Sequence, residues 1–185
     1  MKRIVMGVAL CAALSLAMAE SDAAPVITDK SEIQFTGTQM NVPVEGKFTA
    51  FSGDIQFDPA KPEASRATLV VKTGSADIGL DDGNLTLQQP EWFSADAFPE
   101  ARFVSTHFKS LGGDRYEAAG ELSIKGVSLP VTVPLSVSQD PDGGLSARGE
   151  FSVKRLPFKL GEGDWADTTV VADDVTIRFH IRVAQ

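Results

Sequence analysis

Apolar and polar residues alternate through most of the chain with a period of two, which predicts β-strands. The clearest stretch runs from Tyr116 to Val137, where Leu122 and Ile124 alternate with polar residues before a second alternating run begins. Gly126 separates the two runs and accepts a positive φ at little cost, so the stretch predicts a β-hairpin with one apolar face. A hairpin of this kind needs a second apolar wall, which the rest of the chain must supply.

The second arm of this hairpin contains Pro130 and Pro134, both on its polar side. Each proline removes a backbone donor from the sheet, so this arm is predicted to be an edge-like or weakly paired strand. In the first arm, the alternation places Lys125 on the solvent-facing side together with Glu121 and Ser123.

The same period predicts further strands on both sides of the hairpin, at 31–37, 42–48, 53–58, 65–75, 102–108 and 145–154, and a last strand that begins at Thr169 or Val175 and ends at Val183. Alternation is broken between Phe48 and Phe51, which predicts a bulge or bend that would let a strand curve. Asp140 to Gly144, with the sequence DPDGG, is typical of a turn between two strands.

The segment from Leu80 to Pro99 shows no such alternation and predicts a loop with one or two short helices. Asp81, Asp82 or Asn84 is expected to cap a helical turn there. About eight strands with this one interruption, and no regular exchange of strand and helix, favour an antiparallel sandwich or barrel. Eight strands closed on themselves would enclose room for one small ligand.

The first residues have the pattern of a secretory signal peptide. Lys2 and Arg3 precede an apolar run from Ile4 to Leu16, which is too short to span a bilayer, and Ala17-Met18-Ala19 follows as a cleavage sequence. We therefore expect residues 1–19 to be a signal peptide cleaved near Ala19 and the protein to be exported to the periplasm.

Cleavage would leave a flexible leader, residues 20–25, and one domain, residues 26–185. The single cysteine, Cys11, would leave with the signal, so the exported protein would have no disulfide and would depend on its hydrophobic core. The full chain has a net charge of −8, and loss of Lys2 and Arg3 increases the acidic excess. This charge argues against nucleic acid and anionic lipid surfaces as partners.

Five segments, in this order and spacing, carry a family resemblance. They are VEGKFTAFSGDIQFDP (44–59), SADIG (75–79), WFSADAFPEARFVST (92–106), GELSIKGVSLPVTVPLSV (120–137) and WADTTVVADDVTIRF (165–179). Over nearly all of residues 26–183 the chain resembles the YceI-like family of exported lipocalin-like proteins.

The resemblance implies an all-β fold, an eight-stranded antiparallel lipocalin-like barrel with one or two short helices in the 80–99 segment. It also implies a tunnel that holds a long isoprenoid or similar amphiphile, such as a polyprenyl chain, a quinone tail or a fatty acyl chain, with no other cofactor. Many members carry an Arg-Asp-x-His-Leu pattern before an aromatic pair. Here the corresponding run, Asp81 to Leu85, lacks the arginine and the histidine.

An apolar tunnel needs large apolar side chains and few polar ones, since burial of apolar surface supplies the binding energy. The candidates for its lining are Phe35, Phe48, Phe51, Trp92, Phe93, Phe103, Leu122, Ile124, Phe151, Phe158 and Phe179. The same alternation would also place these side chains in a solid core. The loop from Pro157 to Trp165 is expected either to plug the surface with its aromatic residues or to form a flap over the ligand.

No motif for catalysis or metal binding is present. His107 and His180 are the only histidines, and the alternation puts Ser105 on the same strand face as His107, but two residues do not make a triad. A zinc site needs three or four suitable ligands. The expected partner is a hydrophobic small molecule, together with a transient membrane-protein or electron-transfer partner. The alternatives are a ligand-free structural or partner-binding domain and a lipid-acting enzyme.

Overall fold

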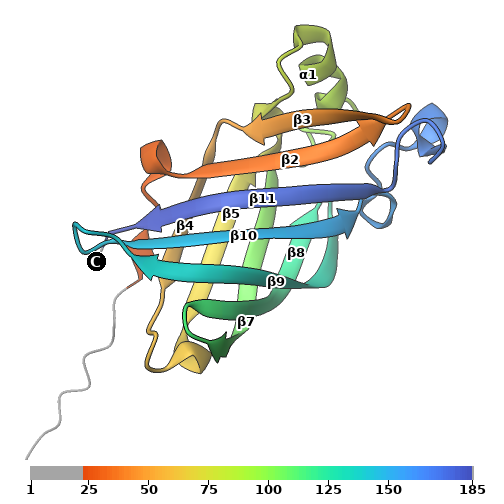
Figure 1. Cartoon of the computed structure of the whole chain (residues 1–185). Coiled ribbons are helices and arrows are strands. Elements are labelled where there is room, and N and C mark those ends of the chain that lie inside the picture. The colour runs from red at the N-terminus through yellow and green to blue at the C-terminus, as the bar shows by residue number, and fades with distance from the viewer. Residues whose placement is uncertain (1–22, 185) are drawn as a thin grey trace, which may run out of the picture.

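The fold is a single antiparallel sheet of eleven strands that curls into a flattened barrel (Figure 1). The computed structural model describes residues 23–184. The strands are β1 (Ala24–Pro25), β2 (Glu32–Gln39), β3 (Val42–Phe48), β4 (Phe51–Gln56), β5 (Arg66–Lys72), β6 (Ala76–Asp77), β7 (Glu100–Gly112), β8 (Arg115–Ile124), β9 (Val127–Gln139), β10 (Leu145–Lys154) and β11 (Asp174–Val183). Their order in the sheet is β1-β4-β5-β7-β8-β9-β10-β11-β2-β3-β6.

The barrel is closed because β3 bends directly into β4. At this bend Thr49 N–H donates to Ser75 O at 3.1 Å, and Lys72 N–H donates to Ala50 O at 2.9 Å. At the other end of β4, the short strand β1 pairs with it while the next residue, Val26, bridges to Val183 of β11. As a result, β2, β3 and β9–β11 cross in front of β4, β5, β7 and β8 at a steep angle (Figure 1).

The prediction of an all-β antiparallel barrel with a bend between Phe48 and Phe51 is confirmed. The predicted stretches, with both hairpin arms, correspond to the nine longer strands, and the structure adds β1 and β6, which have two residues each. Strands this short leave no periodic signal. The predicted flexible leader is wrong for Ala24 and Pro25, which pair with Ile55 and Asp54. Residues 20–22 of the leader and the predicted signal peptide lie outside the described residues.

Inward-facing glycines make room for the aromatic rings inside this small barrel. Gly46 pairs with Phe35 across β2 and β3, and a Cβ added to Gly46 would lie 2.3 Å from that ring. Gly149 pairs with Phe179 across β10 and β11, and its Cβ would lie 2.5 Å from the ring. Since real Cβ atoms do not approach so closely, only glycine lets these two phenylalanines lie flat over the neighbouring strand.

The predicted hairpin corresponds to β8 and β9, which pair along their whole length. The prediction of an edge-like second arm is correct for the half that contains Pro130 and Pro134, which pairs only with β8. It is wrong for Leu135–Gln139, which also pairs with β10. The prolines therefore occupy the part of β9 where no second neighbouring strand needs their missing N–H groups.

Lys125 corrects the predicted solvent-facing side of the hairpin. It lies in the turn with a φ of 48°, next to Gly126 with a φ of 74°, and its side chain is buried. Its Nζ donates to Pro90 O at 2.5 Å, to Lys159 O at 2.7 Å and to Glu162 Oε2 at 2.9 Å. Strand alternation does not extend into a turn, so the period-two rule could not place this side chain. The buried lysine ties two loops to the hairpin.

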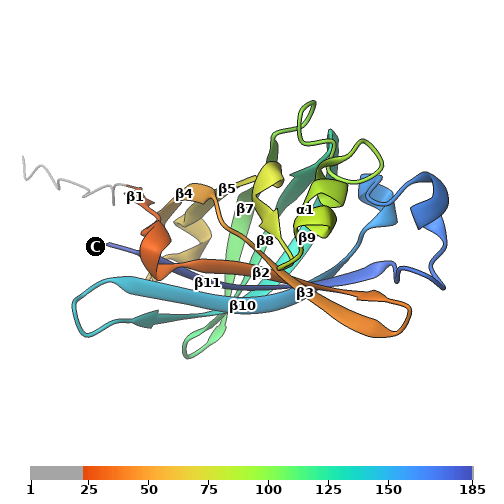
Figure 2. The ribbon, with the colours of Figure 1, turned by 90° about the horizontal axis from the view of Figure 1, so that it is seen from above.

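The predicted helical segment contains one α-helix, α1 (Asp81–Gln88), which lies over one end of the barrel (Figure 2). Asp81 and Asp82 are in its first turn, where negative charge is favourable. Neither they nor Asn84 is the capping residue, because the N-cap is Leu80 and Asn84 Oδ1 instead accepts from Ile78 N–H at 2.8 Å. Across residues 23–184, no helix has the length and apolarity needed to cross a bilayer.

Candidate ligand cavity

A cavity of about 370 Å³ lies inside the barrel, lined by residues of both crossing sets of strands. Its wall is built from the inward-facing residues of every long strand, from α1 and from the loop that precedes β11. Nearly all the side chains that line it are aliphatic or aromatic, and the volume is in the range of pockets that hold small molecules. The cavity therefore fits an apolar ligand better than a polar one.

Ten of the eleven residues predicted to line a tunnel do line this cavity. They are Phe35, Phe48, Trp92, Phe93, Phe103, Leu122, Ile124, Phe151, Phe158 and Phe179. They come from strands and from two loops. Neighbouring rings pack edge to face or tilted, with centroid distances of 5.1 Å for Phe35–Phe48 and 5.9 Å for Phe48–Phe93.

Phe51 is the exception and is not part of the cavity wall. It is half-buried at the start of β4, directly after the bend, and borders a shallow hollow with Thr28, Val70 and Lys72. The bend moves it to the rim of the barrel, and a period-two pattern gives no sign of such a displacement.

One end of the cavity is filled by side chains of β7, β8 and the loop after β4. Phe57 packs edge to face against Phe108 at 5.8 Å and against Tyr116 at 5.0 Å. Phe108 and Tyr116 are buried, and Phe108 belongs to a core cluster with Ala67, Ala118 and Val133. One of the two buried clusters of the core thus lies at this end.

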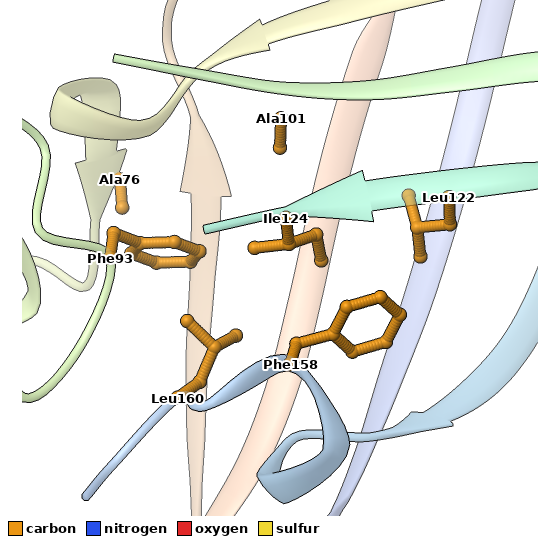
Figure 3. Close-up of a cluster of buried hydrophobic side chains, with 7 residues drawn as sticks. All are labelled: Ala76, Phe93, Ala101, Leu122, Ile124, Phe158 and Leu160. Atoms are coloured by element: carbon orange, nitrogen blue, oxygen red, sulfur yellow. The ribbon is translucent and has the colours of Figure 1, made fainter. Parts of the chain in front are cut away.

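The other end is closed by the loop between β10 and β11. Phe158 and Leu160 of this loop are buried in a cluster with Ala76, Phe93, Ala101, Leu122 and Ile124 (Figure 3). In Figure 3 the two loop side chains face Ile124 and Leu122 at the end of β8. Phe158 is only 2% exposed and Trp165 is half-buried, so the aromatic residues of the Pro157–Trp165 loop are tucked into the barrel end, and a flap over the ligand stays a prediction.

Arg155 fixes this closing loop and was not recognised from the sequence. It is 1% exposed, and its guanidinium donates five hydrogen bonds of 2.7–3.1 Å to backbone carbonyls. The acceptors are Leu160 O, Gly161 O, Trp165 O, Val171 O and Ala172 O. Burial lowers the pKa of Arg155, and the nearby charge of Asp173 opposes that shift. One side chain therefore determines the path of residues 160–172.

Trp92 lies beside Arg155 at the same end of the cavity. The guanidinium carbon of Arg155 is 5.6 Å from the centre of the Trp92 ring, and the Trp165 ring is 5.7 Å away on a tilted plane. The indole Nε1 of Trp92 is buried and has no hydrogen-bond partner among the described residues.

Many other residues of the cavity wall were not among the candidates, and two small ones show a signal that the sequence contained. Gly37 and Ala147 continue the inward-facing alternation of β2 and β10. Small residues at inward positions leave empty space rather than packed wall, and a Cβ at Gly37 would meet no atom within 4 Å.

The residues considered for catalysis do not come together. A β-bulge between Ser105 and His107 places the serine inside and the histidine outside, which corrects the prediction that they share a face. Ser105 Oγ accepts from Ala67 N–H at 2.7 Å. Among residues 23–184, no three His, Cys, Asp or Glu side chains lie close enough to hold a metal ion.

His180 belongs to a separate polar cluster on the outer face of β10 and β11. Its Nε2 lies 3.3 Å from Ser146 Oγ, which in turn donates to Asp140 Oδ2 at 2.6 Å. The serine contacts both the acid and the histidine, and its neighbours Leu145 and Ala147 point into the cavity while it points away. This order differs from a nucleophilic triad, in which the histidine lies between the other two groups.

We expect His180 to make folding stability fall as the solution is acidified below about pH 6.5. Burial lowers its pKa, Arg148 and Arg182 lower it further, and Asp140 and Glu32 oppose the shift. Between the ordinary pKa and the lowered one, the unfolded chain takes up the proton first, so stability is lost as pH falls through this window. Urea unfolding from pH 7.5 to 5 should show a shallower pH dependence in His180→Gln than in the wild type. Equal slopes would contradict this assignment.

The sequence and the fold were compared with known proteins. The model of the YceI-like domain matches residues 25–183. A UPF0312 protein from Shewanella denitrificans is 31% identical over 174 residues, which cover 88% of this chain and 91% of the relative. Several other curated UPF0312 relatives align over only 56% to 65% of their own length.

Solved structures share the architecture. The crystal structure of BcnA from Burkholderia cenocepacia has a TM-score of 0.83 and 38% sequence identity, and the match covers 86% of this chain and 99% of that chain. A polyisoprenoid binding domain from Saccharophagus degradans has a TM-score of 0.72 over 89% of this chain and 99% of that chain. At 17% identity, the second likeness shows the fold alone.

Proposed function

The chain belongs to the YceI-like family, and from this premise we propose that it is a binding protein that encloses one long-chain amphiphile in its barrel. The ligand has an isoprenoid-like or other long apolar chain, such as a polyprenyl chain, a quinone tail or a fatty acyl group. The observation that carries the proposal is the apolar cavity of about 370 Å³. Ligand binding, rather than catalysis, is the function that such a wall supports.

The physical argument rests on the burial of apolar surface, which contributes about 25 cal/mol per Å². A prenyl or acyl chain has many CH₂ and CH₃ groups and gains most from a long apolar wall. The Saccharophagus degradans protein, which has the same fold, is described as a polyisoprenoid binding domain. That description supports a ligand of this chemical class for the present barrel.

We also propose that the protein acts in the periplasm, where it transports or stores the ligand or protects against stress. The apolar run after Lys2 and Arg3 and the Ala17-Met18-Ala19 sequence support export. A ligand with such a long apolar chain resides in membranes, and we propose that a transient membrane-protein or electron-transfer partner takes part in its delivery.

Native mass spectrometry of the protein purified from the periplasm of its host tests this proposal. We expect one prenyl or acyl species per protein, whose mass after organic extraction gives the ligand class. A protein that is empty and also fails to take up added polyprenols or quinones would overturn the proposal in favour of a ligand-free interaction domain.

We expect Phe151→Asp to weaken uptake of an added polyprenol by on the order of a hundredfold. Phe151 lines the cavity from β10, and a carboxylate there costs about 3 kcal/mol or more to bury beside an apolar chain. Leu111→Asp, at an exposed position of β7, is the matched control and should bind as the wild type does. Unchanged uptake by folded Phe151→Asp protein would show that this wall does not contact the ligand.

A further inference from the structure

One end of the cavity is formed by two aromatic rings, which we call the cavity floor. Phe57, which directly follows β4, and Phe108 of β7 both border the cavity, and their rings pack edge to face with centroids 5.8 Å apart. Tyr116 of β8 packs against Phe57 at 5.0 Å but does not border the cavity. Tyr116 therefore lies behind the floor, and a chain in the cavity meets Phe57 and Phe108 first.

The cavity floor lies at the end of the barrel away from α1 and the β10–β11 loop. Phe57 is two residues from Ile55, which pairs with Ala24 of β1. Tyr116 pairs with Leu135 in the part of β9 that leads to the β9–β10 turn. Both views place β1 and this turn toward one end of the barrel, and α1 with the β10–β11 loop toward the other (Figures 1 and 2).

The wall around the cavity floor is apolar. The cavity residues that pack in the same cluster as the floor include Ile55, Ala67, Ala118, Val133 and Leu135. Residues with polar side chains border the cavity elsewhere, such as Thr86 of α1 and Gln39 of β2, which bridges to Val171 in the β10–β11 loop. A polar head group at the floor would find no side-chain partner among these residues and would be buried at a cost, whereas the end of an apolar chain would not.

From these observations we infer that the apolar tail of the bound amphiphile stops against Phe57 and Phe108. These two rings set the longest chain that the barrel encloses completely. Chain carbons beyond that length stay outside the wall and add little affinity, since only buried apolar surface contributes. This inference rests on the proposed function and adds the direction of the ligand and the residues that select its length.

A series of prenols tests where the tail stops. Geraniol, farnesol, geranylgeraniol and the longer prenols have the same alcohol and differ by one isoprene unit at each step. Each added unit should raise the affinity for the wild type at least about tenfold until the tail reaches the floor, and further units should change it about twofold or less. Phe57→Ala should move this limit to a longer prenol, because loss of the ring opens space where the tail stops.

Phe51→Ala is the matched control, because Phe51 is also a half-buried phenylalanine of the β4 region but is not part of the cavity wall, so its limit should equal that of the wild type. Ala118→Leu adds volume beside the floor and should move the limit to a shorter prenol, which keeps the test independent of whether Phe57→Ala folds. A limit that stays at the wild-type prenol in folded Phe57→Ala or Ala118→Leu protein would overturn the inference, while prenol binding by the wild type would leave the proposed function standing. If no prenol binds the wild type, the proposed function fails as well.

A fluorescence measurement on the wild type tests the direction of the ligand without any substitution. The chain has two tryptophans, Trp92 and Trp165, and their rings lie 5.7 Å apart at the end of the cavity away from the floor. Bromine quenches tryptophan fluorescence at short range. We expect dodecanol brominated next to the alcohol to quench this fluorescence more strongly than dodecanol brominated at the far end of its chain. Equal quenching by the two probes, or the reverse order, would contradict a tail that lies against Phe57 and Phe108.

Discussion

Replacing Arg155 with methionine should lower the free energy of unfolding by about 3–5 kcal/mol, because the backbone carbonyls that it satisfies would lose their donors. Methionine has a similar length and fills much of the same space, so the loss reports the guanidinium, including its contact with the Trp92 ring, rather than the volume. Urea unfolding at pH 7 measures this change. The acceptors lie between Leu160 and Ala172, so the β10–β11 loop should also become accessible to proteases in the variant.

Arg178→Met is the matched control for this substitution. Arg178 lies on the outer face of β11, is 63% exposed and pairs with Glu150 at 2.7 Å. An exposed ion pair contributes about 1 kcal/mol or less, so the free energy of unfolding of this variant should stay close to that of the wild type. The free energy of unfolding of Arg155→Lys should lie between those of Arg155→Met and Arg178→Met, because an ammonium has three donors for the five carbonyl acceptors. If Arg155→Met were as stable as Arg178→Met, the carbonyls would have to find other donors and the loop would not depend on this residue.

The sequence predicted the elements that follow a local period. Leu122 and Ile124 are buried as their alternation indicates, and the β8–β9 hairpin and the bend before β4 are where the pattern placed them. The predicted membership in the YceI-like family is confirmed by the match over residues 25–183. The periodic features depend on side chains that lie within a few residues of one another, which is the range over which such a pattern carries information.

Features that depend on distant backbone atoms could not be predicted. The partners of Arg155 are carbonyl groups, which every residue has, so the sequence of residues 160–172 contains no trace of the arginine that binds them. Lys125 is a similar case, since two of its three acceptors are carbonyls of Pro90 and Lys159. Both cations read as surface charges from sequence alone, and both are buried where the closing loop meets the barrel.

The period-two pattern also could not tell which inward-facing positions fill the barrel interior and which leave room for a ligand. Glycines are an exception, because the residue opposite each one on the next strand gives a clue. Phe35 and Gly37 have the same parity in β2, yet the first fills space over Gly46 and the second leaves it open. An inward glycine whose cross-strand partner is an aromatic residue supports a ring. An inward glycine opposite a smaller residue, as Gly37 is opposite Val44, marks a part of the wall where a ligand has room.

Filling that room with Gly37→Trp should abolish binding of a long-chain amphiphile while the protein stays folded. The indole would occupy about 150 Å² of the apolar surface otherwise offered to the ligand, which at about 25 cal/mol per Å² is about 4 kcal/mol, or several hundredfold in affinity. Stability should be retained or increased, because the position is free of close neighbours and an aromatic residue favours a strand more than glycine does. Native mass spectrometry with added polyprenol, together with urea unfolding, measures both effects.

Gly37→Ala is the control for the backbone change alone. Its Cβ would meet no atom within 4 Å, and the loss of glycine reduces the conformational freedom of the unfolded chain, so we expect a gain of about 0.4–1 kcal/mol in stability. Binding should stay within about fourfold of the wild type, since one methyl group removes about 0.8 kcal/mol of ligand contact at most. A Gly37→Trp protein that still takes up a full equivalent of polyprenol would place the ligand outside this part of the barrel. Loss of binding in Gly37→Trp with binding retained in Gly37→Ala would instead place the chain of the ligand between β2, β3 and the closing loop.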